Sequence, residues 1–187
     1  MKIAALAQDV TYSPVLPPSD KAVLVYTDGG CDSQQNNGTG GWAFGVFLPG
    51  ETMPGGEWRW GGKVATTNNR MELWAVINAL EHVEIGPRTI ITTDSEYVIK
   101  GATLWVDSWI KKGWKTYTGT AVKNRDLWER LVILRDLHNV RFDWVKGHSS
   151  NPLNARCDML CTKEISKMKA KFAMGEDYAE DYDMVLA

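Results

Sequence analysis

Four acidic residues stand in local contexts that suit a shared divalent-metal site: Asp28, Glu72, Asp94 and Asp158. Asp28 closes the apolar run at residues 23–27, and Asp94 closes the run at residues 90–93. In an open α/β sheet, ligands bind in the crevice beyond the carboxyl ends of the strands, so two strands that end in Asp can aim both carboxylates at one place. Carboxylate oxygens are the hard ligands that Mg²⁺ and similar ions take. The pattern predicts two strand-end carboxylates at a metal site.

Helices would have to bring the other two carboxylates. Residues 66–69 are helix-capping types, and good helix formers follow, so Glu72 is expected near a helix N-terminus, where negative charge is favoured. Asp158 lies early in a stretch that stays helix-compatible to about Lys169. Taken singly, each of the four has an ordinary interpretation as a turn former, a helix-dipole partner or a solvated surface group. Their sequence contexts together favour a site.

Five segments, in this order along the chain, closely resemble the signature segments of type 1 ribonuclease H. They are YTDGGC at 26–31, TTNNRMEL at 66–73, TTDS at 92–95, WVKGHS at 144–149 and NARCD at 154–158. The resemblance runs from about Lys21 to Lys169, which is most of the chain. It implies an α/β, ribonuclease H-like fold, with a five-stranded mixed β-sheet flanked by helices.

The resemblance also implies an activity. Members of the family cut the RNA strand of an RNA/DNA hybrid internally and leave a 3′-hydroxyl and a 5′-phosphate. They use divalent ions, normally two Mg²⁺ per site, with Mn²⁺ as a possible substitute; two ions about 4 Å apart can clamp the attacking water and the leaving oxygen. Carried over by motif, Asp28 would bridge the two ions, with Asp94 and Glu72 on one side and Asp158 on the other.

His148 is the fifth residue that we place in the site. It lies in a run of turn formers, where a lone His is usually just solvated. The segment around it is similar to the family's own, and this similarity implies that His148 assists proton transfer or product release.

Residues 100–125 form a basic, aromatic stretch that resembles the basic protrusion by which bacterial family members grip the DNA strand. Six basic residues stand there against Asp107 alone. The alternative is that the tryptophans pack a helical pair, with Trp105 and Trp109 facing the core, while the lysines are merely solvated. As the substrate-binding set of this stretch we take Lys111, Lys112, Trp114, Lys115 and Lys123.

Recognition of RNA is expected where polar side chains meet 2′-hydroxyls across the shallow minor groove. By resemblance, Asn68 and Asn69 make those contacts and Asn124 contributes to a pocket for a DNA phosphate. A capping role for Asn68 remains open. The loop at residues 32–40 departs from the bacterial pattern, so the sequence leaves open which of Gln35, Asn36 and Asn37 touches the RNA backbone.

Length and composition predict one compact catalytic domain. The chain has 187 residues, of which 44% are hydrophobic, and nine tryptophans. The net charge of −2 comes from the ends, because residues 21–170 hold 19 basic against 16 acidic residues. We therefore expect a flexible extension at 1–20, the ribonuclease H domain at 21–170 and a disordered acidic tail at 171–187. A sharper alternative makes the tail a docking peptide for a replication or repair protein.

Local patterns predict the element order β-β-β-α-β-α-α-α-β-α. Strands are expected at 21–28, 41–48, 57–65, 88–93 and 141–145. Helices are expected at 68–83, at 95–112 with an interruption around Gly101, at 126–137 and at 152–169.

The three cysteines, Cys31, Cys157 and Cys161, lack paired zinc spacing and favour reduced thiols in a cytoplasmic protein. No apolar run resembles a signal peptide or reaches membrane-spanning length, so we expect no membrane association. We also expect a monomer. Two other function classes stay open: a DNA exonuclease or resolvase of the wider superfamily, and a hybrid-binding module without catalysis. A paired Asp-x-Glu would favour the exonuclease, but the first strand has Asp28-Gly29-Gly30.

Overall fold

The structure is a computed structural model, and it describes residues 22–34, 38–51, 55–147 and 151–176. Its strands are β1 (Ala22–Asp32), β2 (Thr39–Phe47), β3 (Glu57–Val64), β4 (Arg88–Thr93) and β5 (Asn139–Trp144). Its helices are α1 (Asn68–His82), α2 (Glu96–Lys100), the π-helix η1 (Gly101–Trp105), α3 (Val106–Lys111), α4 (Arg125–Leu137) and α5 (Pro152–Ala173).

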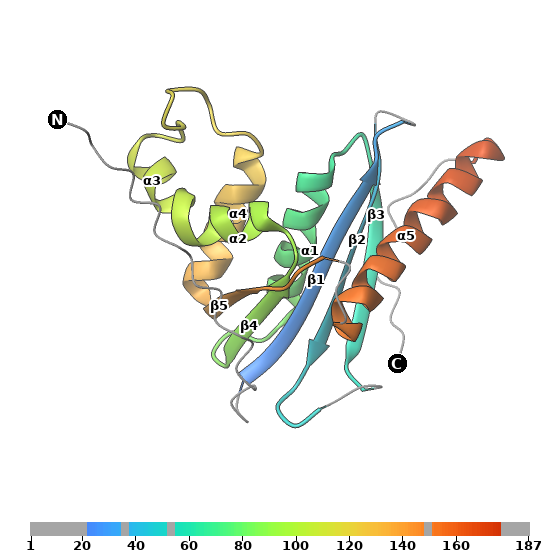
Figure 1. Cartoon of the computed structure of the whole chain (residues 1–187), viewed down its shortest axis with the longest axis horizontal. Coiled ribbons are helices and arrows are strands. Elements are labelled where there is room, and N and C mark those ends of the chain that lie inside the picture. The colour runs from blue at the N-terminus through green and yellow to red at the C-terminus, as the bar shows by residue number, and fades with distance from the viewer. Residues whose placement is uncertain (1–21, 35–37, 52–54, 148–150, 177–187) are drawn as a thin grey trace.

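The five strands form one mixed sheet in the order β3-β2-β1-β4-β5. β1, β2 and β3 pair antiparallel in sequence, while β4 pairs parallel to β1 and β5 pairs parallel to β4. Helices cover both faces: α5 lies on one side, and α1 and α4 lie on the other (Figure 1). This arrangement confirms the predicted fold class and the predicted order of strands and helices.

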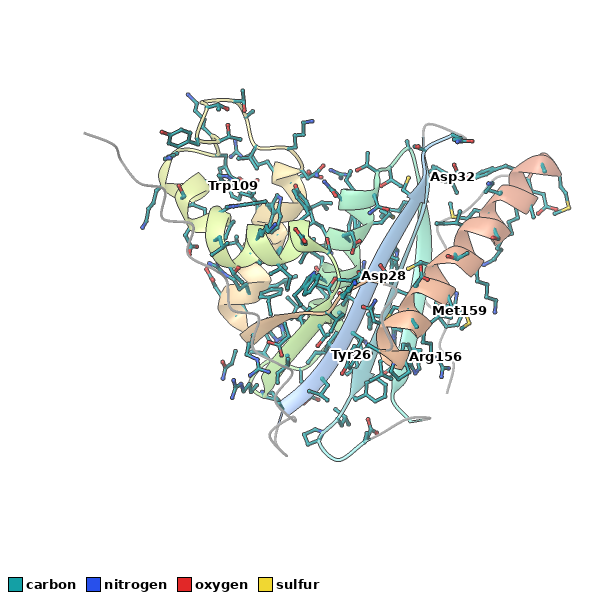
Figure 2. The ribbon with its side chains drawn as sticks, in the orientation of Figure 1. Tyr26, Asp28, Asp32, Trp109, Arg156 and Met159 are labelled. Carbon is teal, nitrogen blue, oxygen red and sulfur yellow. The ribbon has the colours of Figure 1, made fainter. Side chains whose placement is uncertain are left out.

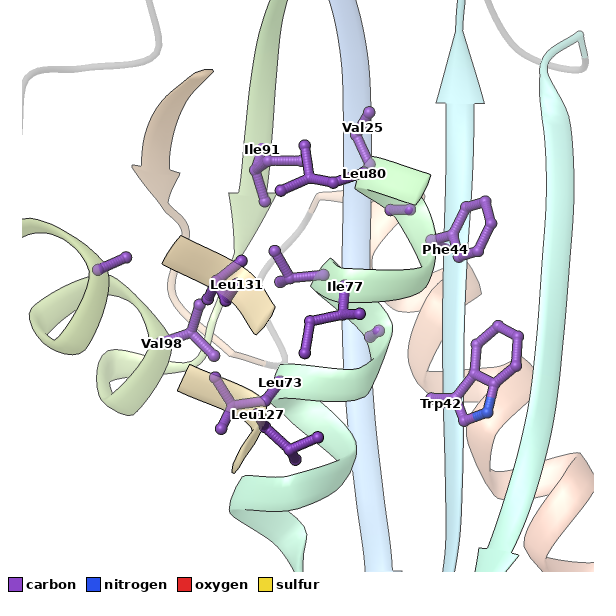
Figure 3. Packing of buried hydrophobic residues seen from close by; sticks show 14 of the residues in the cluster. Val25, Trp42, Phe44, Leu73, Ile77, Leu80, Ile91, Val98, Leu127 and Leu131 are labelled. Carbon is purple, nitrogen blue, oxygen red and sulfur yellow. The ribbon is translucent and has the colours of Figure 1, made fainter. Parts of the chain in front are cut away.

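Side chains that alternate between the two faces of the strands form one hydrophobic core on each face of the sheet. Trp42 and Phe44 in β2 point toward α1 and join the larger cluster, with Leu73, Ile77 and Leu131 (Figure 3). The neighbouring side chains of β2 and β3 point the other way and pack under α5 in a cluster of Ala43, Phe47, Trp58, Trp60, Cys157, Leu160 and Cys161. Because successive residues of a strand face opposite sides, one strand supplies both cores.

The first strand corrects one prediction. Asp28 does not end β1, because the strand continues to Asp32. The reason is the pairing: β4 pairs with Ala22–Thr27 and then stops, whereas β2 pairs with β1 through Asp32. Asp28 is therefore the first residue past the end of the parallel ladder, on a strand that the antiparallel neighbour prolongs.

Other boundaries differ from expectation by a few residues. The last helix continues to Ala173, four residues beyond the predicted end, and the predicted interruption at Gly101 is a turn of π-helix between α2 and α3. Gly101 lies against the Trp128 ring, where a Cβ would clash. The extension at 1–20 and residues 177–187 of the tail lie outside the described residues.

Candidate active site

Three of the four predicted carboxylates converge where β4 ends beside β1. Asp28 lies on β1 (Figure 2), Asp94 follows the last residue of β4, and Glu72 lies in the second turn of α1. One oxygen atom from each lies within 4.8 Å of the others. Strands β1 and β4 bring the two aspartates together as the parallel pairing predicts, and α1 packs on β1 so that Glu72 meets them.

Asp158 faces the same cavity from α5. The cavity has a volume of about 290 Å³, and Asp28, Glu72, Asp94 and Asp158 all line it. Asp158 is half-buried and is not one of the three carboxylates that meet within 4.8 Å. The structure therefore places all four predicted carboxylates at one cavity, three of them tightly grouped.

Burial and mutual repulsion make two of these carboxylates weak acids. Asp28 is 8% exposed, and burial, followed by repulsion from Asp94, raises its pKa from 3.8 to about 7. The backbone N–H of Gly29, which donates to Asp28 Oδ1 at 2.8 Å, works against this rise. Burial, together with the charges of Asp28 and Asp94, also raises the pKa of Glu72 well above its ordinary value. The group therefore resists carrying its full negative charge unless a cation is bound.

The donor set fits a divalent cation. All four groups offer hard oxygen atoms, and Glu72 Oε2 is buried with no hydrogen-bond partner among the described residues. A buried, unpartnered carboxylate oxygen is costly, and a bound cation would satisfy it. The residues that could hold such an ion are Asp28, Glu72, Asp94 and Asp158.

The raised pKa of Asp28 predicts how the metal-free protein responds to pH. The folded state holds this proton more tightly than the unfolded state, so the associated stability is fully present below about pH 4 and is lost as pH rises through about 7. Asp28→Asn removes this loss. We expect the metal-free variant to exceed the wild type in free energy of unfolding by a few kcal/mol at pH 8, since about 3 pKa units correspond to about 4 kcal/mol.

Urea unfolding of both proteins in EDTA at pH 4 and pH 8 measures this difference. The two proteins should differ by less than about 1 kcal/mol at pH 4, where Asp28 is protonated in the folded state and about half protonated in the unfolded state. A divalent cation added at pH 8 should raise the melting temperature of the wild type and release protons, which calorimetry in buffers of different ionisation enthalpy detects. Equal stabilities at pH 8 in EDTA would contradict the raised pKa.

The asparagines of the expected RNA contact lie at the start of α1. Asn68 is exposed and lines the cavity, and Asn69 beside it is exposed. The N-cap residue is Thr67, whose side chain makes no capping hydrogen bond, so Asn68 is the first helical residue and not the cap. Asn68 therefore borders the cavity from the first turn of α1.

Asn124 is held in place by an aromatic residue that the sequence reasoning missed. It precedes α4 in the left-handed region, with φ of 56°, and its Nδ2 donates to Tyr97 Oη at 3.2 Å. Trp128 Nε1 donates to the same oxygen at 2.8 Å. Arg70 and Asp126 join the starts of α1 and α4 through two hydrogen bonds of 3.0 and 2.7 Å. Asn68 and Asn69 at the start of α1 and Asn124 at the start of α4 therefore lie on the same side of the molecule.

The predicted basic protrusion, residues 100–125, stands away from the sheet around α3 and the loop to α4 (Figure 1). Its tryptophans are partly structural, as the alternative interpretation held for Trp109, which packs against the larger core together with Trp114. Trp105, also expected to face the core, instead contacts Trp109, with ring centroids 5.7 Å apart. The lysines of the predicted set are all exposed: Lys111, Lys112, Lys115 and Lys123. The protrusion thus combines tryptophans that pack against the core with lysines that are exposed to solvent.

Some predicted residues cannot be placed. His148 and the candidates Gln35, Asn36 and Asn37 lie outside the described residues. Among the described residues, no helix is both long and apolar enough to cross a membrane.

Comparisons with known protein families and sequences agree with one another. A family model described as RNase H matches residues 20–166. A ribonuclease H from Hahella chejuensis is 45% identical over 156 residues, which cover 83% of this chain and 98% of the relative. A ribonuclease H from Alcanivorax borkumensis is 45% identical over 151 residues, covering 81% and 96%.

A solved structure agrees with these relatives. The crystal structure of LC9-RNase H1, described as a type 1 RNase H with the type 2 active-site motif, matches with a TM-score of 0.68 and 31% identity. The match covers 81% of this chain and 75% of that one.

Proposed function

This chain belongs to the ribonuclease H family, whose activity is hydrolysis of the RNA strand in RNA/DNA hybrids, and from that premise we propose its mechanism and products. We propose that it cuts the RNA strand internally by two-metal-ion hydrolysis and leaves a 3′-hydroxyl and a 5′-phosphate. The observation that carries this proposal is the meeting of Asp28, Glu72 and Asp94 within 4.8 Å, in a cavity that Asp158 also lines.

The four carboxylates would hold two Mg²⁺ ions, with Mn²⁺ as a possible substitute. When bound, such ions stabilise the charge that develops on the scissile phosphate and lower the pKa of a bound water. The protein's own contribution is to fix the positions of the carboxylates. The adjacent strands β1 and β4 hold the two aspartates, and α1, which packs closely on Gly29 of β1, brings Glu72 beside them. We assign His148 the role of assisting proton transfer or product release.

Substrate selection belongs to the surface beside the cavity. We propose that Asn68 and Asn69 contact 2′-hydroxyls, because they are exposed at the start of α1 and Asn68 lines the cavity. Asn124 would bind a DNA phosphate, with its amide oriented by Tyr97. The protrusion would hold the DNA strand through Lys111, Lys112, Trp114, Lys115 and Lys123.

One assay tests the proposal against its alternatives. Internally labelled RNA/DNA hybrid, duplex DNA, duplex RNA and single strands are incubated with the protein in Mg²⁺ or in EDTA. We expect cleavage of the hybrid alone, only with Mg²⁺, and products whose 5′ ends lose phosphate to a phosphatase. Cleavage of duplex DNA but not of the hybrid would favour the DNA nuclease class. Tight hybrid binding without cleavage would favour the binding module.

The lysines of the protrusion should act mainly on affinity. We expect K111Q/K112Q/K115Q to raise the KM for the hybrid about 10- to 100-fold at 0.1 M salt while kcat changes less than about threefold. Each lost phosphate contact should also lower the slope of log affinity against log salt by about 0.7–0.9. Steady-state kinetics across a salt series measures both effects.

A charge-matched control separates a local contact from net charge. The control R88Q/K163Q removes two positive charges, as K111Q/K112Q does. It removes them away from the protrusion: Arg88 begins β4 at the end of that strand away from Asp94, and Lys163 is exposed on α5. We expect R88Q/K163Q to leave KM and the salt slope near wild-type values. Equal effects of the two pairs would contradict a specific role for the protrusion.

The setting of the enzyme is also a proposal. We propose a cytoplasmic, monomeric enzyme; the free thiols Cys31, Cys157 and Cys161 support the reducing location. We keep the acidic tail as a candidate docking peptide for a replication or repair protein. Deletion of residues 176–187 should then reduce capture of that partner, and unchanged capture would remove the idea.

A further inference from the structure

Asn154 is a buried polar residue beside the cavity. The proposed function gives it no role. It lies in the first turn of α5 and is 3% exposed. The helix starts at the N-cap residue Asn151, whose side chain accepts hydrogen bonds from the backbone N–H groups of Leu153 and Asn154 at 3.0 and 3.2 Å. The backbone of Asn154 is therefore held by the N-cap of the helix.

That side chain points at a predicted metal ligand. Asn154 Nδ2 donates to Asp94 Oδ2 at 3.3 Å, across 60 residues of sequence. The amide must face Asp94 with its nitrogen, because a carboxylate only accepts and the reversed amide would oppose two acceptors. The other end, Asn154 Oδ1, is buried without a partner among the described residues. A buried amide that leaves its oxygen unsatisfied is costly for folding, so this position is poorly explained by stability alone.

Asp94 is held from two further directions. Trp144 Nε1, at the end of β5, donates to the backbone oxygen of Asp94 at 3.1 Å. Gly147 lies so close that a Cβ there would come within 2.8 Å of Asp94 Oδ2. These contacts limit the space around Asp94, whose carboxylate also lies within 4.8 Å of ligand oxygens of Asp28 and Glu72.

We propose that Asn154 is a positioning residue that holds the Asp94 carboxylate toward Asp28 and Glu72 against their repulsion, so that the metal-binding group is formed before the ion arrives. The inference rests on the proposed metal site. Without the amide donor, Asp94 can turn away from its like-charged neighbours, and binding an ion must first bring it back. Neighbours that orient a metal ligand typically change metal affinity or activity about 10- to 100-fold when lost.

Two variants test the proposal. Asn154→Ala removes the side chain, and Asn154→Leu keeps its approximate volume while removing both the donor and the unsatisfied oxygen, so it preserves the packing. For each we measure Mn²⁺ affinity by calorimetry, the rise in melting temperature that Mn²⁺ produces, and kcat and KM on hybrid across a Mg²⁺ series. We expect Mn²⁺ affinity and kcat at limiting Mg²⁺ to fall about 10-fold or more, with KM for hybrid within about threefold of wild type.

Cys157→Ala is the matched control. Cys157 is buried on the same helix, and its thiol donates to the Tyr26 carbonyl at 3.3 Å and not to a carboxylate. We expect C157A to lower the melting temperature by the same amount in EDTA and in Mn²⁺. Its Mn²⁺ affinity should equal that of the wild type. Wild-type Mn²⁺ affinity in both N154A and N154L, or the same loss of affinity in C157A, overturns the positioning role.

The controls also separate this inference from the proposed function. A wild type that neither binds Mn²⁺ nor cuts hybrid refutes the metal site itself. A wild type that does both, beside Asn154 variants that behave identically, refutes only the role of Asn154.

Discussion

Asp28→Asn abolishes hybrid cleavage, with an expected loss of more than about 10³-fold, or about 4 kcal/mol of transition-state stabilisation. The amide keeps the shape of the side chain but removes the charge at the centre of the group, where Asp28, Glu72 and Asp94 meet within 4.8 Å. Asp94→Asn is expected to have the same effect. Asp158→Asn should cost less, because Asp158 lines the cavity from outside that group.

Single-turnover cleavage of labelled hybrid in Mg²⁺ measures these losses, and circular dichroism checks that each variant is folded. Asp32→Asn is the matched control, since Asp32 lies on the same strand, does not line the cavity and pairs with Lys169 at 2.6 Å. We expect it to cut at the wild-type rate. Wild-type turnover by purified Asp28→Asn or Asp94→Asn would refute the assignment of the carboxylates.

The sequence could predict which carboxylates meet because local signals decide most of that geometry. Asp28 and Asp94 each follow an apolar run, and parallel neighbouring strands bring such positions to the same edge of the sheet. Glu72 follows helix-capping residue types, so its place near the start of α1 was also visible locally. Composition alone did not reveal this site; the order of short motifs along the chain did.

The length of β1 could not be predicted locally. Gly29 and Gly30 are typical of a turn, and turn residues after an apolar run indicate a strand's end. Here they stay in the strand because β2 continues the pairing beyond Asp28, and α1 packs closely on Gly29, where a side chain would not fit. A pairing partner in the next segment of the chain overrides a local turn signal.

Long-range contacts account for the other omissions. Tyr97 orients Asn124 across 27 residues, and Asn154 reaches Asp94 across 60. Neither residue stands in a pattern of spacing that marks a partner so distant in sequence. Only the fold, by setting α2 beside α4 and α5 beside the end of β4, makes these side chains neighbours.

Close approach of helix and strand at Gly29 leads to the second large effect. A Cβ on Gly29 would overlap the backbone of α1, inside van der Waals distance of Glu72 N and 2.5 Å from Met71 O. Backbone atoms cannot rotate away as a side chain can, so Gly29→Ala must push α1 off β1. We expect a loss of about 3 kcal/mol or more in free energy of unfolding, at the upper end for an overpacked site.

The same displacement should damage the site, because Glu72 belongs to the turn of α1 that Gly29 touches. A shift of about 1 Å in a catalytic group can cost about 10²-fold in rate. We therefore expect Gly29→Ala, assayed at a temperature where it is still folded, to lose about 100-fold in kcat and to bind Mn²⁺ more weakly.

Gly30→Ala separates the helix contact from a general effect of alanine in β1. Its added Cβ would meet only Ile165 Cδ1 at 3.7 Å, an ordinary contact, and φ at neither glycine is positive. Alanine there restricts the unfolded chain and should leave the free energy of unfolding within about 1 kcal/mol of wild type. Urea unfolding of the two variants decides the matter: equal stabilities would mean that α1 accommodates the methyl group at Gly29, and that Glu72 is not fixed by contact of α1 with β1.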